Sequence, residues 1–121
     1  MSLDDIMNEA MTIQGAVGVA LVDYGSGMAL ATAGGGGLDL EAAAAGNTEV
    51  VRAKLATMAS LGLEDSIEDI LITLSTQYHL IRLVQGDGQD GLFIYLALNR
   101  QTANLAMARR QLEKLEGGVK I

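Results

Sequence analysis

The sequence predicts an α+β fold, an α/β/α sandwich in which a five-stranded antiparallel sheet lies between helical layers. The first observation is the segment 92–98, which is apolar at every position and is bracketed by Gly91 and Asn99. A short continuous apolar run is typical of a strand buried on both faces, because a strand with one wet face alternates apolar and polar residues. The second observation is the order of patterns along the chain, which is helix, strand, strand, helix, strand, strand, strand, helix.

The composition limits the class of protein. The 121 residues, half of them hydrophobic, suit one domain over 1–121 with a normal core. The chain has no cysteine, which excludes disulfides, thiolate zinc sites and a cysteine nucleophile, and is typical of an intracellular protein. The apolar stretches are shorter than the roughly 18 residues of a spanning helix, and the N-terminus is acidic where a secretory signal is basic. We therefore expect a cytoplasmic protein without direct membrane insertion.

The charge is negative and uneven. The net charge is −7, with 11 acidic and 2 basic residues in 1–69 and 4 acidic and 6 basic residues in 70–121. A negative surface argues against binding to nucleic acid or to anionic membranes. The unequal halves suit contact with an oppositely charged partner, and they are also what chance would produce.

Residues 3–14 have the periodicity of an amphipathic helix. Ser2 and Asp5 resemble a capping box, and Gly15 stands where a C-terminal helix glycine belongs. The apolar stripe of this helix consists of Leu3, Ile6, Met7, Ala10 and Met11.

A hairpin is predicted next, with strands at 16–23 and 28–32 joined by the turn 24–27. Small residues alternate along one face of the first strand, which predicts the close approach of a helix there. These residues are Ala16, Gly18 and Ala20. The run Gly34 to Gly37 is then predicted to be a flexible link.

The longest predicted helix covers residues 40–61, with Asp39 as its N-cap and Gly62 ending it. Its apolar arc contains Leu40, Ala43, Ala44, Val50, Val51, Leu55, Met58 and Leu61. The opposite face is unusually small, with Ala42, Ala45, Gly46, Ala53, Ala56 and Ser60 beside the charged Glu49 and Arg52. Two interpretations stay open: an alanine-rich helix of good propensity, or a helix that packs on a second subunit.

The remainder predicts a three-stranded meander and a last helix. The strands are expected at 70–76, 78–84 and 92–98, with a glycine-rich turn before the last of them. The helix is expected to begin after a cap at Asn99 or Thr102 and to run to Glu116. Its stripe is Leu105, Ala108, Leu112 and Leu115, and its solvent face carries Arg110, Glu113 and Lys114.

The glycine-rich segments do not predict a ligand site. Gly34 to Gly37 lacks the Lys-Ser/Thr of a phosphate-binding loop and the spacing of a dinucleotide fingerprint, so we interpret it as a connector. Asp87 and Asp90 lie among glycines, but a Ca²⁺ site needs about 6–8 oxygen ligands, and this loop supplies few. We expect a hairpin turn there.

The ionisable residues do not form a recognisable catalytic set. His79 is the single histidine, and no nucleophile is spaced to use it as a base, so a structural role is favoured. Glu64, Asp65, Glu68 and Asp69 form a charged loop of the kind that protects an edge strand. The sequence therefore predicts neither an enzyme nor a cofactor.

Three stretches of the sequence resemble the roadblock (dynein light chain) family. They are QGAVGVALVD at 14–23 followed by MALA at 28–31, IEDILI at 67–72 followed by YHLIR at 78–82, and LFIYLALNR at 92–100 followed by NLAMAR at 104–109. Each is a pattern of apolar and turn residues, and their order and spacing resemble the family over nearly the whole chain.

This resemblance implies a homodimer in which the third strand pairs with its copy and the long helix packs beside it. The implied interface comprises Ala42, Ala45, Glu49, Arg52, Ala53, Ala56, Ile70, Ile72 and Leu74. A stand-alone domain of this length is similar to the bacterial members that bind small Ras-like GTPases and modulate their nucleotide cycle. The alternative implied function is a non-enzymatic dimeric scaffold that bridges larger protein complexes.

Overall fold

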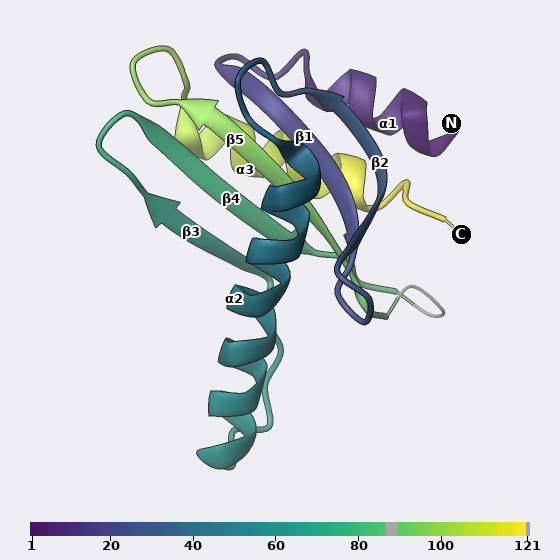
Figure 1. The fold of residues 1–121 in the computed structure, drawn as a ribbon, viewed down its shortest axis with the longest axis vertical. Helices are drawn as coiled ribbons and strands as arrows, with labels where there is room; N and C mark the ends of the chain where they lie inside the picture. The colour runs from purple at the N-terminus through teal and green to yellow at the C-terminus, as the bar shows by residue number, and fades with distance from the viewer. Residues whose placement is uncertain (87–89, 121) are drawn as a thin grey trace.

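The computed structural model describes residues 1–86 and 90–120 (Figure 1). Its elements are α1 (Leu3–Ala10), β1 (Ala16–Asp23), β2 (Met28–Gly34), α2 (Leu40–Ser60), β3 (Asp69–Thr73), β4 (Gln77–Leu83), β5 (Leu92–Asn99) and α3 (Leu105–Glu116). Over these residues the strands form one five-stranded antiparallel sheet in the order β2-β1-β5-β4-β3. The predicted element order and the α/β/α arrangement are confirmed.

The strand β5 lies at the centre of the sheet and is buried on both faces, as its continuous apolar run predicts. Ile94, Leu96 and Leu98 belong to the core cluster that α1 and α3 cover. Phe93, Tyr95 and Ala97 belong to the core cluster on the α2 side. Burial of a large apolar side chain contributes about 1.5–3 kcal/mol, so this strand is a main source of stability.

The helices divide unequally between the two faces of the sheet. Figure 1 shows α1 and α3 on one face, whereas α2 crosses the other face and its second half extends past the sheet. The contacts of α2 with the sheet are mainly with β1 and β2. The part of this face over β3 and β4 is therefore less covered than the part over β1.

The close approach of a helix to the small face of β1 is confirmed for Gly18 and Ala20, whereas Ala16, beyond a register shift, packs in the cluster that α1 and α3 cover. A Cβ atom added to Gly18 would lie 2.9 Å from Cα of Gly35 and 3.2 Å from Cδ2 of Leu40, the first residue of α2. Ala20 is fully buried in the same cluster as Leu40. The small side chains of β1 thus set how closely α2 and the segment after β2 can pack.

The predicted helix caps are confirmed at three termini. Ser2 Oγ accepts a hydrogen bond from the Asp5 N–H at 3.1 Å, and Asp5 Oδ2 accepts one from the Ser2 N–H at 3.0 Å. Hydrogen bonding to the Ser2 backbone N–H first, and to the Ser2 hydroxyl second, stabilises the carboxylate and lowers the pKa of Asp5. Asp39 Oδ1 accepts from the Ala42 N–H at 3.0 Å. Gly62, at φ +69°, ends α2, because glycine adopts this left-handed conformation without the steric cost that a Cβ atom imposes.

Several predicted boundaries are wrong. The first helix ends at Ala10 rather than near residue 14, and the following turn buries Ile13. Gly15 does not terminate this helix. A Cβ atom added to Gly15 would lie 2.8 Å from Cβ of Ala103, so the glycine permits contact with the link before α3.

The other boundary differences concern β2, β3, β4 and the start of α3. The strand β2 continues to Gly34, so this glycine is part of the sheet rather than of a flexible link. The strands β3 and β4 each end earlier than predicted, at Thr73 and Leu83. The N-cap of α3 is Asn104, whose Oδ1 accepts from the Met107 N–H at 3.1 Å, and not Asn99 or Thr102.

Candidate interaction surface

The strand β3 ends the sheet, and in the described part of the chain its outer edge pairs with no other strand. The Leu74 N–H donates to the Gln77 carbonyl at 2.8 Å. This bond shows which residues of β3 direct their backbone groups toward β4. Backbone groups alternate in direction along an antiparallel strand, so Ile70 and Ile72 bond inward. The outward-pointing N–H and C=O groups belong to Asp69, Leu71 and Thr73. This edge offers backbone partners for a further strand.

Beside this edge, the face of the sheet on the α2 side is partly open. Ile70, Ile72 and His79 are half-buried. The His79 ring meets the Tyr95 ring edge-on at 5.3 Å, and its Nε2 lies 2.8 Å from Gln77 Oε1. Burial lowers the pKa of His79 and raises the pKa of Tyr95, so both side chains are held in their neutral forms near pH 7. The result is a neutral, mixed apolar and aromatic surface.

The predicted interface residues fall into two groups. The six residues on α2 are all exposed, along one continuous strip of the helix that faces away from its own sheet; they are Ala42, Ala45, Glu49, Arg52, Ala53 and Ala56. Ile70 and Ile72 are half-buried in β3, and Leu74 is exposed just after it. The structure brings the β3 group together at the sheet edge, while α2 lies over the opposite half of the sheet. Their assignment to an interface stays a prediction.

The predicted apolar arc of α2 is wrong at two positions. Val50 is 37% exposed and Leu61 is 66% exposed. Leu61 is exposed because the end of α2 lies beyond the sheet, as Figure 1 shows. Conversely, Thr48 is buried, and its hydroxyl donates to the Ala44 carbonyl at 2.8 Å, which removes the cost of burying it.

Two ion pairs that tie α3 to the β3 end of the sheet are missing from the sequence-based prediction. Arg82 Nε lies 3.1 Å from Glu116 Oε1, and the two side chains are 11% and 7% exposed. The other carboxylate oxygen of Glu116 accepts from the Gln85 N–H at 3.2 Å. At the surface, Arg109 contacts both carboxylate oxygens of Asp69 at 3.0 and 3.1 Å. The sequence gives no signal for pairs separated by 34 and 40 residues.

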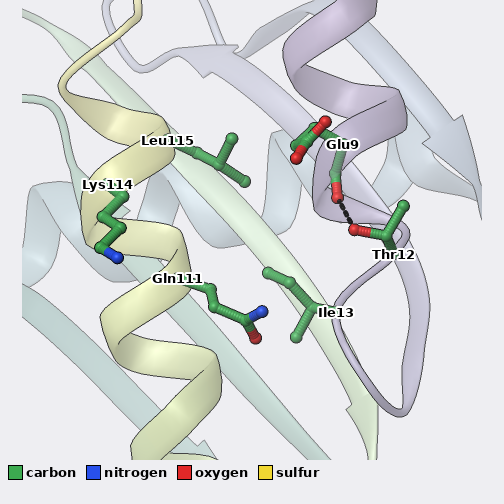
Figure 2. A pocket seen from close by; sticks show the side chains of 6 residues that line it. All are labelled: Glu9, Thr12, Ile13, Gln111, Lys114 and Leu115. Carbon is green, nitrogen blue, oxygen red and sulfur yellow. Dashed lines mark hydrogen bonds between the residues drawn. The ribbon is translucent and has the colours of Figure 1, made fainter.

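Figure 2 shows a small cavity of about 210 Å³ between α1 and α3. Glu9 and Thr12 line one side, Gln111 and Lys114 line the other, and Ile13 and Leu115 supply apolar surface. Small-molecule sites have volumes of about 300–1,000 Å³ and enclose most of their ligand. This cavity is too small to indicate a substrate site.

The glycine-rich candidates of the sequence do not assemble a site. Asp87 lies outside the described residues, and Asp90 is exposed. Over residues 1–86 and 90–120, no group of three or more His, Cys, Asp or Glu side chains is placed to hold a metal ion. Gly35 is buried, and its N–H donates to the Val17 carbonyl at 2.8 Å. This N–H is therefore used in the sheet and does not bind an anion. None of the helices in the described part is long and apolar enough to cross a membrane.

Comparison with solved structures identifies the fold, whereas no protein-family model and no curated protein matches the sequence. A Roadblock/LC7 domain from Streptomyces avermitilis superposes with a TM-score of 0.82 at 14% identity, covering 98% of this chain and 95% of that one. This chain has the roadblock fold. Myxococcus xanthus MglB superposes with a TM-score of 0.74 at 18% identity, covering 94% and 85%. The gliding protein MglB from Thermus thermophilus gives 0.76 at 15% identity, covering 93% and 81%.

Proposed function

We propose that this roadblock-fold chain is a homodimeric regulator that binds a small Ras-like GTPase and modulates its nucleotide cycle. The observation that carries the proposal is the outer edge of β3 with the partly open sheet face beside it. The fold shared with two MglB proteins supports the sequence resemblance, which implies such a partner. In this proposal the chain acts in the cytoplasm, without a cofactor or catalytic residues of its own.

The geometry of β3 favours one way of forming the dimer. An antiparallel pair centred on Leu71 would place Asp69 opposite the partner's Thr73, so that all three outward-pointing residues share ladder hydrogen bonds. Ile70 would then face the partner's Ile72 across the new pair. Cross-strand apolar pairs contribute roughly 0.2–1 kcal/mol each beyond the hydrogen bonds.

The exposed strip of α2 would complete this interface. Its alanines allow a second backbone to approach closely, and the open face at Ile72 and His79 needs a cover of that kind. Glu49 and Arg52 carry opposite charges on the same strip, three residues apart. In a twofold dimer, Glu49 of each subunit can therefore pair with Arg52 of the other.

An engineered cysteine tests the dimer, because the natural chain contains no cysteine. The Cα atoms of a hydrogen-bonded antiparallel pair are about 5.5 Å apart, within the range of about 4.4–6.8 Å that disulfides span. Leu71→Cys should therefore give covalent dimers under mild oxidation, seen on a non-reducing gel. Thr32→Cys on the opposite edge is the matched control and should stay monomeric on the gel. The reverse pattern would refute the β3 dimer.

The GTPase proposal is tested with a Ras-like GTPase encoded beside this gene. The purified proteins should co-elute, and the rate of GTP hydrolysis or nucleotide release should change when this chain is added. Ile72→Asp, which places a charge at the proposed dimer boundary, should remove the effect together with the dimer. Neither co-elution nor a change in rate would contradict the proposal.

A dimeric scaffold is the second candidate, favoured by the composition of the α2 strip. Four of its six residues are alanine, which suits packing more than action on a nucleotide. A scaffold would bind the same GTPase, or bridge other proteins, and leave the hydrolysis rate unchanged. The hydrolysis measurement therefore separates the two functions.

A further inference from the structure

The strand β2 ends the sheet opposite β3, and it too offers an outer edge. The Gly35 N–H donates to the Val17 carbonyl at 2.8 Å, which fixes the phase of the ladder with β1. The backbone N–H and C=O groups of Thr32 therefore point away from the sheet. In the described residues no strand pairs with this side of β2.

The side chains of β2 leave this edge unprotected. The strand reads MALATAG, without charge or proline, and natural sheets commonly place one or the other on an edge to prevent further pairing. Met28 is 65% exposed and Leu30 is 44% exposed. The β-bulge at Leu30 interrupts the ladder, and Gly34 leaves the extended conformation at φ +68°, so the regular accessible segment is 31–33. A short extended segment is what such an edge can accept.

The segments that contact this edge carry a single sign of charge. The helix α1 and the first half of α2 contact β2 from its two faces. Residues 1–51 contain no basic residue, and their acidic residues are Asp4, Asp5, Glu9, Asp23, Asp39, Glu41 and Glu49. All of these except the half-buried Asp23 are exposed. The side chains of β2 are therefore uncharged, and the charged side chains of the segments that contact it are acidic.

We propose that the outer edge of β2 binds an extended, lysine- or arginine-bearing segment of a partner protein as an added strand. Backbone hydrogen bonds would supply affinity, and the acidic side chains of α1 and α2 would select basic residues on the incoming segment. A second copy fits this edge less well, because pairing β2 with β2 would bring two acidic α1 helices together. This site is independent of the β3 dimer, which would leave one β2 edge accessible on each subunit.

Synthetic peptides test the proposal directly on the full chain. The probe is an eight-residue peptide in which lysine alternates with valine, labelled with a fluorophore and followed by anisotropy. The first control is the same pattern with glutamate in place of lysine. The second has four lysines followed by four valines, which keeps the charge but removes the alternation. We expect the alternating lysine peptide to bind most tightly, and added salt to weaken its binding.

A proline at position 32 separates strand addition from simple charge attraction. Thr32→Pro removes an outward N–H and fills the edge without touching the ladder to β1, a place where sheets tolerate proline. It should weaken binding of the lysine peptide about tenfold, as the loss of an edge hydrogen bond with added steric block predicts. Thr32→Val, which keeps the backbone donor, is the matched control and should bind within about twofold of the natural chain. Equal affinity for both variants would overturn the proposal.

Charge reversal provides the second variant, in case Thr32→Pro disturbs folding. Glu41 lies in the first turn of α2 and does not cap the helix. Glu41→Lys should weaken the lysine peptide and strengthen the glutamate peptide, each by about two- to fivefold at low salt. Unchanged affinities for both peptides would overturn the role of charge. Covalent dimers from Thr32→Cys would overturn the choice of occupant, because they would place a second copy on this edge.

Discussion

The two ends of the sheet are built from different chemistry. At the β3 end, Arg109 pairs with Asp69 and Arg82 pairs with Glu116, so both signs of charge are present close to the edge. At the β2 end, the strand is neutral, and it is tied to its neighbours by the small residues Gly18 and Gly35. One end is held by ionic contacts with α3, and the other by close backbone packing.

This difference bears on which partner each edge can accept. A twofold axis brings every charge of one subunit near the same charges of the other, so a surface with both signs can rearrange into complementary pairs. A surface with one sign cannot, and it instead favours a partner of opposite charge. The β3 end therefore suits a second copy of the chain, and the β2 end suits a different chain.

The largest expected effect in a single subunit concerns Glu116. Glu116→Ala leaves the Arg82 guanidinium nearly buried without its partner and removes the acceptor of the Gln85 N–H. Loss of one partner of a buried pair costs about 3–5 kcal/mol, so we expect the free energy of unfolding to fall by roughly 3 kcal/mol in urea denaturation. Asp69→Ala breaks the more exposed pair and should cost less than about 1 kcal/mol. Equal effects would show that the ionic contacts do not hold the β3 end.

A charge placed on each edge compares the two ends as interfaces. Ile72→Asp should weaken the proposed dimer at least about 100-fold, or roughly 2.7 kcal/mol, because it puts a carboxylate at the twofold boundary. Thr32→Asp, on the other edge, should leave the dimer intact. Sedimentation or light scattering of the two variants decides between the edges. A dimer that survives Ile72→Asp and is lost in Thr32→Asp would show that the subunits pair through β2 and not through β3.

Close packing at the β2 end is tested by adding one methyl group. A Cβ atom at Gly18 would lie 2.9 Å from backbone atoms of Gly35, which cannot move aside as a flexible side chain can. Gly18→Ala should therefore lower the free energy of unfolding by about 2 kcal/mol. Gly46→Ala is the control, since its added Cβ would meet nothing within 4 Å, and helix propensity predicts a gain of up to about 1 kcal/mol. A neutral Gly18→Ala would show that this end is loosely packed.

The smallest expected effect is a pH dependence at the β3 end. Burial lowers the pKa of His79 from its ordinary value of 6.5, so the unfolded chain binds this proton more readily than the folded chain. The contribution of neutral His79 to the free energy of unfolding is present in full above pH 6.5, and it is lost as the pH falls toward the pKa of His79 in the folded chain. His79→Gln should lose less stability between pH 7 and pH 5.5 than the natural chain, measured by urea midpoints. An identical loss in both proteins would assign the effect to other groups.

The features predicted correctly are those whose cause is local. The unbroken apolar run of β5 and the caps at Ser2 and Asp39 each depend on residues a few positions apart, so the sequence displays them directly. The cap of α3 was predicted at Asn99 or Thr102 and is Asn104 instead. Several residues in this stretch have side chains that suit a cap, and Asn99 is the last residue of β5.

The features that could not be predicted depend on where distant segments meet. A helical wheel places Leu61 on the apolar arc of α2, but it does not reveal that the sheet ends before that turn. Gly15 looks like a helix terminator until Ala103 is known to lie against it. The ion pairs of Arg82 and Arg109 join parts of the chain too far apart to show a pattern. The interface residues on α2 and β3 stay a prediction, since a single subunit shows their exposure but not what covers them.

The second half of α2 has a further consequence for how the molecule opens. Figure 1 shows the last turns of this helix beyond the sheet, beside the chain segment that leads back to β3 rather than over a strand. Few long-range contacts therefore hold these last turns, so they can unravel while the sheet stays intact. Amide protons from about residue 52 to residue 60 should exchange with solvent faster than those of β1 and β5, and a protease should make its first cut there.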